Sequence, residues 1–475
     1  MPPGVEPGEV QGNVLHAYGG DFPSARFVRV RVAPSADARA AGAVVARWLG
    51  ALSFGRRPTG LPERERLAPH VNLAVTASGL AALGVPPGLL QAFPDDFREG
   101  AKARAAGLGD RWPDEQPSFV EADLLLSVHA GDHHAAECRM RALLEENAAA
   151  GRPLEVVQER PAGGDEGARE PFGFADGGSQ PAVEGVDLDP VGDGVYAARI
   201  GTGGHLRRRA EDLGIVEPQR GWRLLRAGEF LLGHPGEDGA APPGPPAPLG
   251  PDGTFMVYRE LDQDVDGFRA YVAEQARRVG MHASTLEEKI VGRRRDDGTT
   301  LVRPAEDFPP PAPAPDANGR NGRRRRSNDF LYAGDPHGYR CPVGAHVRRT
   351  NPRDALPGGG ERTMRHRIIR RGMRYKPPEN GLVFICLSAS IANGFEFIQR
   401  NWINNGTALG LGSDPDFLLQ QAEDGRPRGH MVIPGYRPVV LPPPERPFVT
   451  VRGCEYLFVP SRRASAWLAG LQATS

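Results

Sequence analysis

Hydrophobic and polar positions divide the first 160 residues into strand, helix and strand units. Residues 25–33 alternate apolar and polar side chains, which predicts a half-buried strand. By composition and short apolar runs, two helices are predicted at residues 36–52 and 132–150, and three more strands at residues 71–76, 122–130 and 153–160. Two split strand–helix–strand units of this kind make a ferredoxin-like sandwich.

The second half of the chain repeats this plan loosely. Residues 264–280 predict an amphipathic helix, with Val265, Phe268, Val272 and Ala276 on one face. Another helix is predicted at residues 389–404, and strands at residues 254–261, 365–375, 381–389 and 447–461. The pattern predicts an α+β fold of duplicated ferredoxin-like domains, with antiparallel sheets and packed helices, divided into residues 1–165 and 166–475. Residues 280–364 do not fit the repeat and are interpreted as a functional insertion, because compact domains rarely carry such long loops without a use.

Composition changes this picture little. The chain has 475 residues, enough for two domains, and its formal net charge of −1 gives no global attraction to nucleic acid or an anionic membrane. No apolar run is long enough to span a bilayer, and the N-terminus lacks the pattern of an export signal. The four cysteines are far apart and form no CxxC pair, which argues against a disulfide framework and a Cys-based zinc site. We expect a cytoplasmic location, with export left open.

Three low-complexity stretches are rich in Pro, Gly or Arg, at residues 235–253, 308–327 and 441–447. The run Arg323 to Arg326 could suggest polyanion binding. It is a single basic cluster without interleaved aromatic residues, so a solvated loop tip is the favoured interpretation.

The segment FGFADGGSQP, at residues 172–181, holds one carboxylate, Asp176, among glycine, serine and aromatic residues. Gly, Asp and Ser are turn formers, so the segment alone favours a simple chain reversal. A carboxylate on a glycine-rich loop can also approach a ligand closely, because glycine removes side-chain bulk. The segment alone leaves both interpretations open.

His346 stands out among the twelve histidines because an arginine cluster follows it in YRCPVGAHVRRTNPRD, at residues 339–354. A lone histidine is more often an ordinary polar residue, since most metal sites need several convergent ligands. Haem is different, because its iron takes one axial histidine and its two propionates accept bidentate arginine pairs. The segment therefore indicates a haem site, with His346 on the iron and Arg348 and Arg353 near the propionates.

Several motifs together resemble those of the dye-decolorising (DyP-type) haem peroxidases, in the family's order. Residues 172–181 resemble its GxxDG signature, residues 341–354 its proximal-histidine segment, and RIIRRG at residues 367–372 its distal-arginine strand. The strand and helix that follow are similar at residues 381–402, and the chain ends are similar at VQGNVL (residues 10–15) and PFVTVRGCEYLFVPS (residues 447–461). The resemblance covers about residues 10–470, and the duplicated ferredoxin-like layout is the family's fold. Residues 235–253 and 308–327 look like insertions.

The resemblance implies roles for individual residues, in a haem pocket within the C-terminal half. His346 would be the proximal iron ligand of one haem b per chain, Asp176 the distal acid and Arg370 the distal arginine. Strand alternation would place Arg367 and Arg371 on the face opposite Arg370, and the family motif favours Arg370. The remaining assignments are Leu382 and Phe384 as an apolar roof near the distal face, and Asp416, with Asp414 as the alternative, as acceptor from the non-ligating nitrogen of His346.

The implied activity is reduction of hydrogen peroxide with oxidation of organic donors such as dyes and phenolics. Asp176 would shuttle the peroxide proton, and Arg370 would stabilise the charge that develops on peroxide. An acidic optimum is expected, because the reference pKa of Asp is about 3.9 against about 6.5 for His. The alternatives are a haem-binding or haem-handling protein with little turnover and a structural protein without a cofactor. Asp176 and Arg370 favour the enzyme, because storage needs no distal acid.

Bulky donors do not fit a small sealed pocket, so oxidation at the surface through an aromatic residue is a further expectation. The candidates are Trp222, Trp402, Tyr375 and Tyr456, although such residues more often serve packing. Hydrogen peroxide and small or bulky aromatic reductants are the expected partners, with no nucleic acid and no membrane. The sequence leaves the oligomeric state open.

Overall fold

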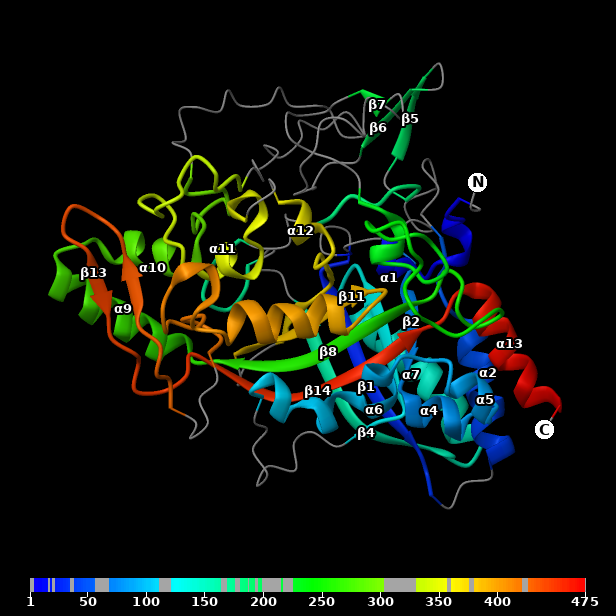
Figure 1. The fold of residues 1–475 in the computed structure, drawn as a ribbon. Helices are drawn as coiled ribbons and strands as arrows, with labels where there is room; N and C mark the ends of the chain where they lie inside the picture. The colour runs from blue at the N-terminus through cyan, green and yellow to red at the C-terminus, as the bar shows by residue number, and fades with distance from the viewer. Residues whose placement is uncertain are drawn as a thin grey trace.

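In the computed structural model, one large antiparallel sheet lies at the centre of the protein, and helices pack on it (Figure 1). In the described residues this sheet has nine strands, in the order β10-β4-β1-β3-β2-β14-β8-β11-β9. The described residues are 4–15, 18, 22–34, 38–55, 68–110, 121–163, 169–175, 180–186, 188–192, 195–198, 215–216, 225–302, 330–356, 360–375, 380–420 and 426–474.

The first ferredoxin-like unit forms as the sequence predicts. Its elements are β1 (Ser24–Val32), α2 (Ala38–Gly50), β2 (His70–Val75), β3 (Leu124–Ala130), α7 (His133–Ala149) and β4 (Leu154–Gly163). The strands lie in the order β4-β1-β3-β2, and all three pairings are antiparallel. Asp132 caps α7, because its side chain accepts a hydrogen bond from the backbone N–H of Ala135 at 2.7 Å.

The second unit repeats this order with β14-β8-β11-β9, which confirms the duplicated α+β fold. Its elements are β8 (Thr254–Gln263), α9 (Val265–Val279), β9 (Ile369–Arg370), β10 (Met373–Tyr375), β11 (Gly381–Ser388) and β14 (Val449–Val459). The predicted strand at residues 365–375 is two short strands, β9 and β10. The predicted helix at residues 389–404 is π-helical over Ala392–Glu396 and Ile398–Ile403. Such helices are rare and frequently occur at functional sites.

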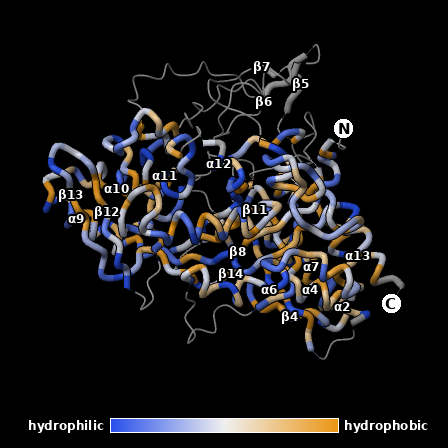
Figure 2. Tube along the Cα trace, in the orientation of Figure 1, coloured by the Kyte–Doolittle hydropathy of each residue, from blue (hydrophilic) through white to orange (hydrophobic). Residues whose placement is uncertain are grey.

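The two units share one sheet and much of one core. β2 pairs with β14 at Val75 and Phe458, which joins the two halves of the sheet. β10 pairs with both β4 and β11, so it connects a strand of the first unit to a strand of the second on the other side and closes the sheet. One buried cluster joins Phe27 of the first unit to Met256 and Leu387 of the second. Hydrophobic and hydrophilic residues are mixed along the chain in the region of the sheet (Figure 2), and β3 and β11 are mainly apolar along their length. A domain boundary between residues 165 and 166 stays a prediction.

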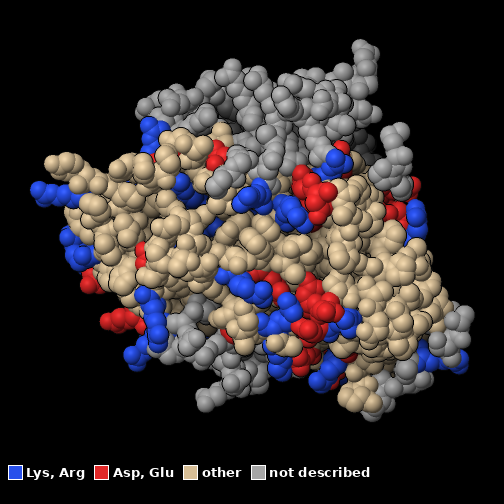
Figure 3. All heavy atoms as spheres, viewed as in Figure 1, with Lys and Arg blue, Asp and Glu red and all other residues tan. Residues whose placement is uncertain are grey.

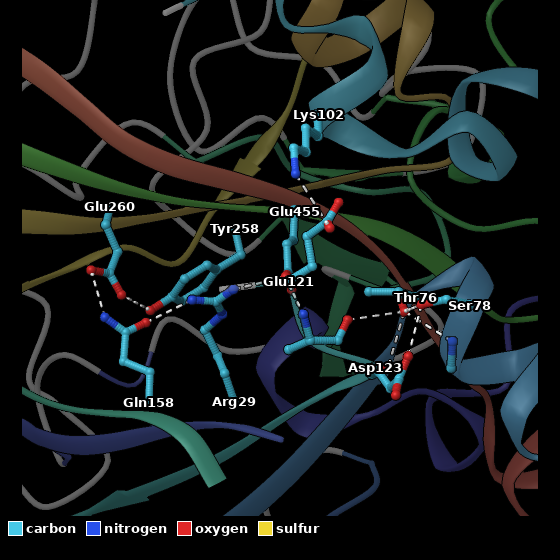
Figure 4. Close-up of polar contacts among 12 residues, drawn as sticks. Arg29, Thr76, Ser78, Lys102, Glu121, Asp123, Gln158, Tyr258, Glu260 and Glu455 are labelled. Atoms are coloured by element: carbon cyan, nitrogen blue, oxygen red, sulfur yellow. Dashed lines mark hydrogen bonds and ion pairs between the residues drawn. The ribbon is translucent and has the colours of Figure 1, made fainter. Parts of the chain in front are cut away.

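A buried polar network also joins the two units. The guanidinium of Arg29 on β1 donates to Glu455 on β14 at 2.7 Å and to Gln158 on β4 at 2.8 Å. Glu260 on β8 accepts from Gln158 at 3.1 Å and from the Tyr258 hydroxyl at 2.8 Å. These side chains point toward one another in Figure 4. Because buried polar groups are costly without partners, the network favours one fixed register between the units.

Further elements surround the sheet, and most of them were not predicted. The helices are α1 (Gly12–Leu15), α4 (Ala77–Ala82), α5 (Pro87–Leu90), α6 (Asp95–Arg104), α10 (Ala283–Val291), α11 (His346–Thr350), α12 (Glu361–Met364) and α13 (Arg462–Thr474). The short 3-10 turns are Pro7–Glu9, Ala106–Leu108, Ala227–Glu229, Arg353–Ala355 and Ala408–Gly410. The small strands are β5 (Leu188–Gly192), β6 (Val195–Ala198), β7 (Ile215–Val216), β12 (Met431–Ile433) and β13 (Val439–Leu441).

None of the helices in the described residues is long and apolar enough to cross a membrane. The four cysteines are all free, and only Cys138 is exposed. Basic and acidic side chains lie side by side on the face shown in Figure 3. Residues 308–327 lie outside the described part of the chain, whereas residues 235–253 form an ordered loop with Leu249 buried in the core.

Candidate active site

A cavity of about 240 Å³ lies in the second unit, between the sheet, the π-helical segment and α11. Its wall is mainly apolar. Alternate positions of the strands supply Leu382 and Phe384 from β11, Leu261 from β8, and Val449 and Val451 from β14. Among the described residues, five arginines and one acidic residue, Glu170, also line the cavity, and the arginines are Arg259, Arg293, Arg353, Arg367 and Arg370. The cavity therefore suits an apolar ligand that carries negative charge.

His346 is the first residue of α11 and lines this cavity. Its Nδ1 lies 3.0 Å from Oδ2 of Asp416. Since a carboxylate only accepts, Nδ1 carries the proton, and Nε2 keeps a lone pair for another group. Asp416, and not the alternative Asp414, is thus the described partner of the imidazole.

Asp416 is fully buried and held in place by the chain around it. Its other oxygen, Oδ1, accepts from the backbone N–H groups of Leu418 at 3.0 Å and Leu419 at 2.8 Å. Burial raises the pKa of the Asp416 carboxyl, but the electrostatic interaction and hydrogen bond with His346 and the charge of Arg349 outweigh burial, so the pKa is lower than usual. Asp416 is therefore ionised near neutral pH and can polarise the imidazole.

The three arginines that follow His346 have different positions. Arg353 lines the cavity and is buried, with a left-handed φ of 46°. Such a conformation is costly for a residue with a Cβ and is often kept at functional sites. Arg349 donates to the backbone oxygens of Trp402 and Asn405 and so ties α11 to the π-helical segment.

Arg348 does not line the cavity, contrary to the expectation that it meets a propionate. Its guanidinium donates to the Cys341 carbonyl at 2.7 Å and lies 4.7 Å from the centre of the Tyr332 ring. Residues 346 and 348 are two apart on a helix and therefore face different directions. Arg353 lines the cavity and Arg348 does not, and a contact between Arg353 and a propionate stays a prediction.

Arg367 and Arg370 both line the cavity, whereas Arg371 donates to the carbonyls of Asn13 and Val14. Strand alternation had placed Arg367 with Arg371 and opposite Arg370. That expectation was wrong because β9 contains only Ile369 and Arg370, so no strand runs through position 367. Arg367 and Arg370 are therefore both candidates for the distal arginine.

Asp176 lies outside the described residues, but both ends of its loop are attached to cavity residues. Before the loop, the Ala175 carbonyl accepts from Arg293 at 2.9 Å. After it, the Gln180 side chain accepts from the backbone N–H of Arg370 at 2.9 Å. Gly173 has a φ of 99°, a backbone conformation that strains any residue with a Cβ, so this position favours glycine.

Several lining residues had no signal in the sequence. Arg259 and Gln263 are ordinary polar positions of a strand, yet they reach the cavity beside Leu261. Arg259 is paired with the buried Asp110 at 2.7 Å, and Gln399 accepts from it at 3.1 Å. His366 also lines the cavity and stacks on Phe397 with ring centres 3.4 Å apart. Its position within RHRIIRRG, just before Arg367 and Arg370, could have indicated this.

The three candidate surface aromatics that the structure describes are all buried. Trp402, Tyr375 and Tyr456 are buried, with exposed fractions of 6%, 1% and 1%. Trp222 lies outside the described residues. Oxidation at the surface therefore stays a prediction.

Fold and site together define an α+β protein with duplicated ferredoxin-like units, in which one carboxylate-paired imidazole faces an apolar, arginine-rich cavity. Residues 253–409 match the family described as Dyp-type peroxidase, C-terminal. The chain is 28% identical to dye-decolorizing peroxidase msp1 of Mycetinis scorodonius, over 83% of this chain and 75% of that one. It is 29% identical to multifunctional dye peroxidase DyP2 of Amycolatopsis sp. (strain ATCC 39116 / 75iv2), over 83% and 81%.

Solved structures share the whole fold. An ancestral D-type dye decolorizing peroxidase superposes with a TM-score of 0.74 at 24% identity, covering 98% of this chain and 99% of that one. A fungal DyP-type peroxidase from Auricularia auricula-judae superposes with a TM-score of 0.73 at 21% identity, covering 99% and 100%. The chain belongs to the DyP-type peroxidase family, as its motifs predicted, and is an enzyme of that type with haem as its cofactor.

Proposed function

We propose that this enzyme reduces hydrogen peroxide at a haem b whose iron is bound by His346, and that it oxidises dyes and other aromatic donors. The observation that carries the proposal is the His346–Asp416 pair at the wall of an apolar, arginine-lined cavity. The relatives named above as dye peroxidases support the donor class.

The residues present fit haem by their chemistry. A porphyrin needs apolar walls, which Leu382, Phe384 and Val451 provide, and its propionates need cations, which Arg353 provides within the same cavity. His346 is left with Nε2 as the ligating atom, because Asp416 occupies Nδ1. When bound, haem supplies the iron that accepts electrons from donors and delivers them to peroxide.

The chain's own residues would manage proton and charge on the distal side. Asp176 would take a proton from one peroxide oxygen and return it to the other, directly or through a water. Arg370 would stabilise the negative charge that develops on peroxide, because its position is fixed before the reaction. Asp416 would keep the imidazole of His346 electron-rich.

An acidic optimum follows from this assignment. An aspartate with an ordinary pKa near 3.9 is ionised at pH values where histidine, near 6.5, is already protonated. Proton transfer from peroxide should thus continue well below neutral pH.

Titration of the apoprotein with haemin, followed by absorption spectroscopy, tests the ligand assignment. His346→Ala should lose most haem binding or shift the Soret band strongly, while His366→Ala, which changes another histidine of the cavity wall, should bind one haem per chain. An unchanged Soret band and affinity in His346→Ala would contradict the proposal. Turnover of a dye with peroxide by wild-type enzyme then separates a peroxidase from a haem-handling protein.

A further inference from the structure

The side chain that follows Arg370 turns away from the cavity and binds a segment more than 350 residues earlier in the chain. The guanidinium of Arg371 donates from Nε to the Asn13 carbonyl at 2.6 Å and from the second terminal nitrogen to the Val14 carbonyl at 2.7 Å. Both acceptors belong to the segment Gln11–Leu15, part of the VQGNVL motif, which the catalytic assignment leaves unused.

Gln11–Leu15 is itself firmly attached at the seam between the two units. The amide of Gln11 donates to the carbonyls of Leu73 at 2.9 Å and Pro460 at 3.0 Å, and accepts from the Leu73 N–H at 3.1 Å. The Asn13 N–H donates to the Asn72 side chain at 3.1 Å. Gln11, Asn13 and Val14 are buried, so the two carbonyls that Arg371 uses have fixed positions.

The strand that carries Arg370 is weakly held by comparison. β9 has only two residues and one neighbour in the described sheet, β11. Side chains therefore supply hydrogen bonds to the backbone of Arg370 that a longer strand would receive from neighbouring strands. Gln180 accepts the N–H of Arg370 at 2.9 Å, and Arg371 donates back to the Arg370 carbonyl at 3.0 Å. The backbone N–H of Arg371 donates to the Ile385 carbonyl at 2.8 Å.

We propose that Arg371 is a positioning residue for peroxide reduction: anchored to the Gln11–Leu15 segment, it fixes the peptide of Arg370 so that the Arg370 side chain stays in the cavity. This inference rests on the distal role proposed for Arg370. The second guanidinium acts through the backbone of the first and touches no reactant. Because misplacement of a catalytic group by about 1 Å can cost ~100-fold in rate, the anchor has a catalytic consequence.

A double-mutant cycle on the haem-loaded full chain tests the inference. The measured quantity is the second-order rate constant with hydrogen peroxide, by stopped flow, in wild type, Arg371→Met, Arg370→Leu and the double variant. We expect Arg371→Met to be about 10- to 100-fold slower than wild type. In the Arg370→Leu background the same change should have almost no further effect, because the group that it positions is gone.

Arg371→Lys and Arg365→Met complete the set. A lysine keeps the charge but cannot span both carbonyls with one rigid fork, so it should recover only part of the lost rate. Arg365 pairs with Asp238 at the surface at 2.9 Å, and Arg365→Met should keep the wild-type rate. Full recovery by lysine would show that charge alone matters and would overturn the anchor.

Hydrogen exchange on the apoprotein provides a readout without haem. Arg371→Met should raise the exchange of amides in residues 369–371, and Arg365→Met should not. If Arg371→Met does not fold, the cycle is run with Arg371→Lys. If Arg371→Met slowed the reaction by the same factor in wild type and in Arg370→Leu, the inference would be overturned. The change would then act on the structure as a whole and not through Arg370. An unchanged rate in Arg370→Leu would instead refute the proposed distal role.

Discussion

The imidazole of His346 donates from Nδ1 to Asp416, 3.0 Å away, across 70 residues of sequence. The carboxylate is fully buried and receives two further backbone hydrogen bonds, so it cannot turn away from the ring. The pair fixes the tautomer of the imidazole and the direction of its free nitrogen.

Asp416→Asn should raise the reduction potential of the haem iron and weaken haem retention. The neutral amide makes the imidazole less basic, and loss of such a partner typically costs about 10- to 100-fold in metal affinity or activity. Spectroelectrochemistry of the loaded protein measures the potential. Asp414→Asn is the matched control and should leave both properties near wild type. Equal potentials in the Asp416→Asn variant and wild type would refute the role of the pair.

Arg370→Leu should slow the reaction with peroxide by about 100- to 1000-fold, since removal of one preorganised donor commonly has that cost. Arg367→Leu should slow it less, although Arg367 also lines the cavity and is buried. Stopped-flow rates with hydrogen peroxide compare the two variants. The reverse ranking would move the distal role to Arg367.

Asp176→Asn should depress the peroxide step and remove its acid limb while haem stays bound through His346. An amide cannot accept the peroxide proton, whereas a carboxylate with the reference pKa of about 3.9 is ionised down to about pH 4. The rate constant with peroxide, measured from pH 3 to 8 in both proteins, checks this. A wild-type profile in the variant would leave Asp176 as a turn residue only.

His129→Phe should make the protein more resistant to acid. His129 is buried, and its pKa is lowered to about 3 by burial and by the nearby charges of His70 and Arg371. In the unfolded chain the imidazole of His129 takes up a proton near pH 6.5, whereas in the folded protein it stays neutral down to about pH 3. The free energy of unfolding is therefore unaffected by His129 above pH 6.5 and decreases as the pH falls from 6.5 toward 3. The loss is about 1.4 kcal/mol per pH unit.

Thermal or urea unfolding between pH 4 and 7 measures this effect. As the pH falls, the free energy of unfolding should decrease more in wild type than in His129→Phe. The exposed His337→Phe should show no such difference from wild type. A constant difference between His129→Phe and wild type at every pH would mean that His129 does not limit acid stability. The result bears on function, because an acidic optimum needs a fold that survives acid.

Local patterns were enough to predict most of the framework. Alternation in residues 25–33 and the helical spacing of residues 264–280 are properties of short segments, and β1 and α9 formed within two residues of the predicted bounds. The histidine–arginine segment likewise singled out His346 and Arg353, which both line the cavity, while their roles stay predictions.

Only the tertiary structure decided how these pieces meet. It placed Arg348 outside the cavity and Arg367 inside, because the direction of a side chain depends on where a helix or strand begins and ends. It brought Asp110, Arg259 and Gln399 together and closed the sheet through β10, which are contacts between distant segments. It also connected Arg371 to Asn13. Such contacts form because residues from distant segments are buried in one shared core. A local sequence pattern does not show which distant segments will meet there.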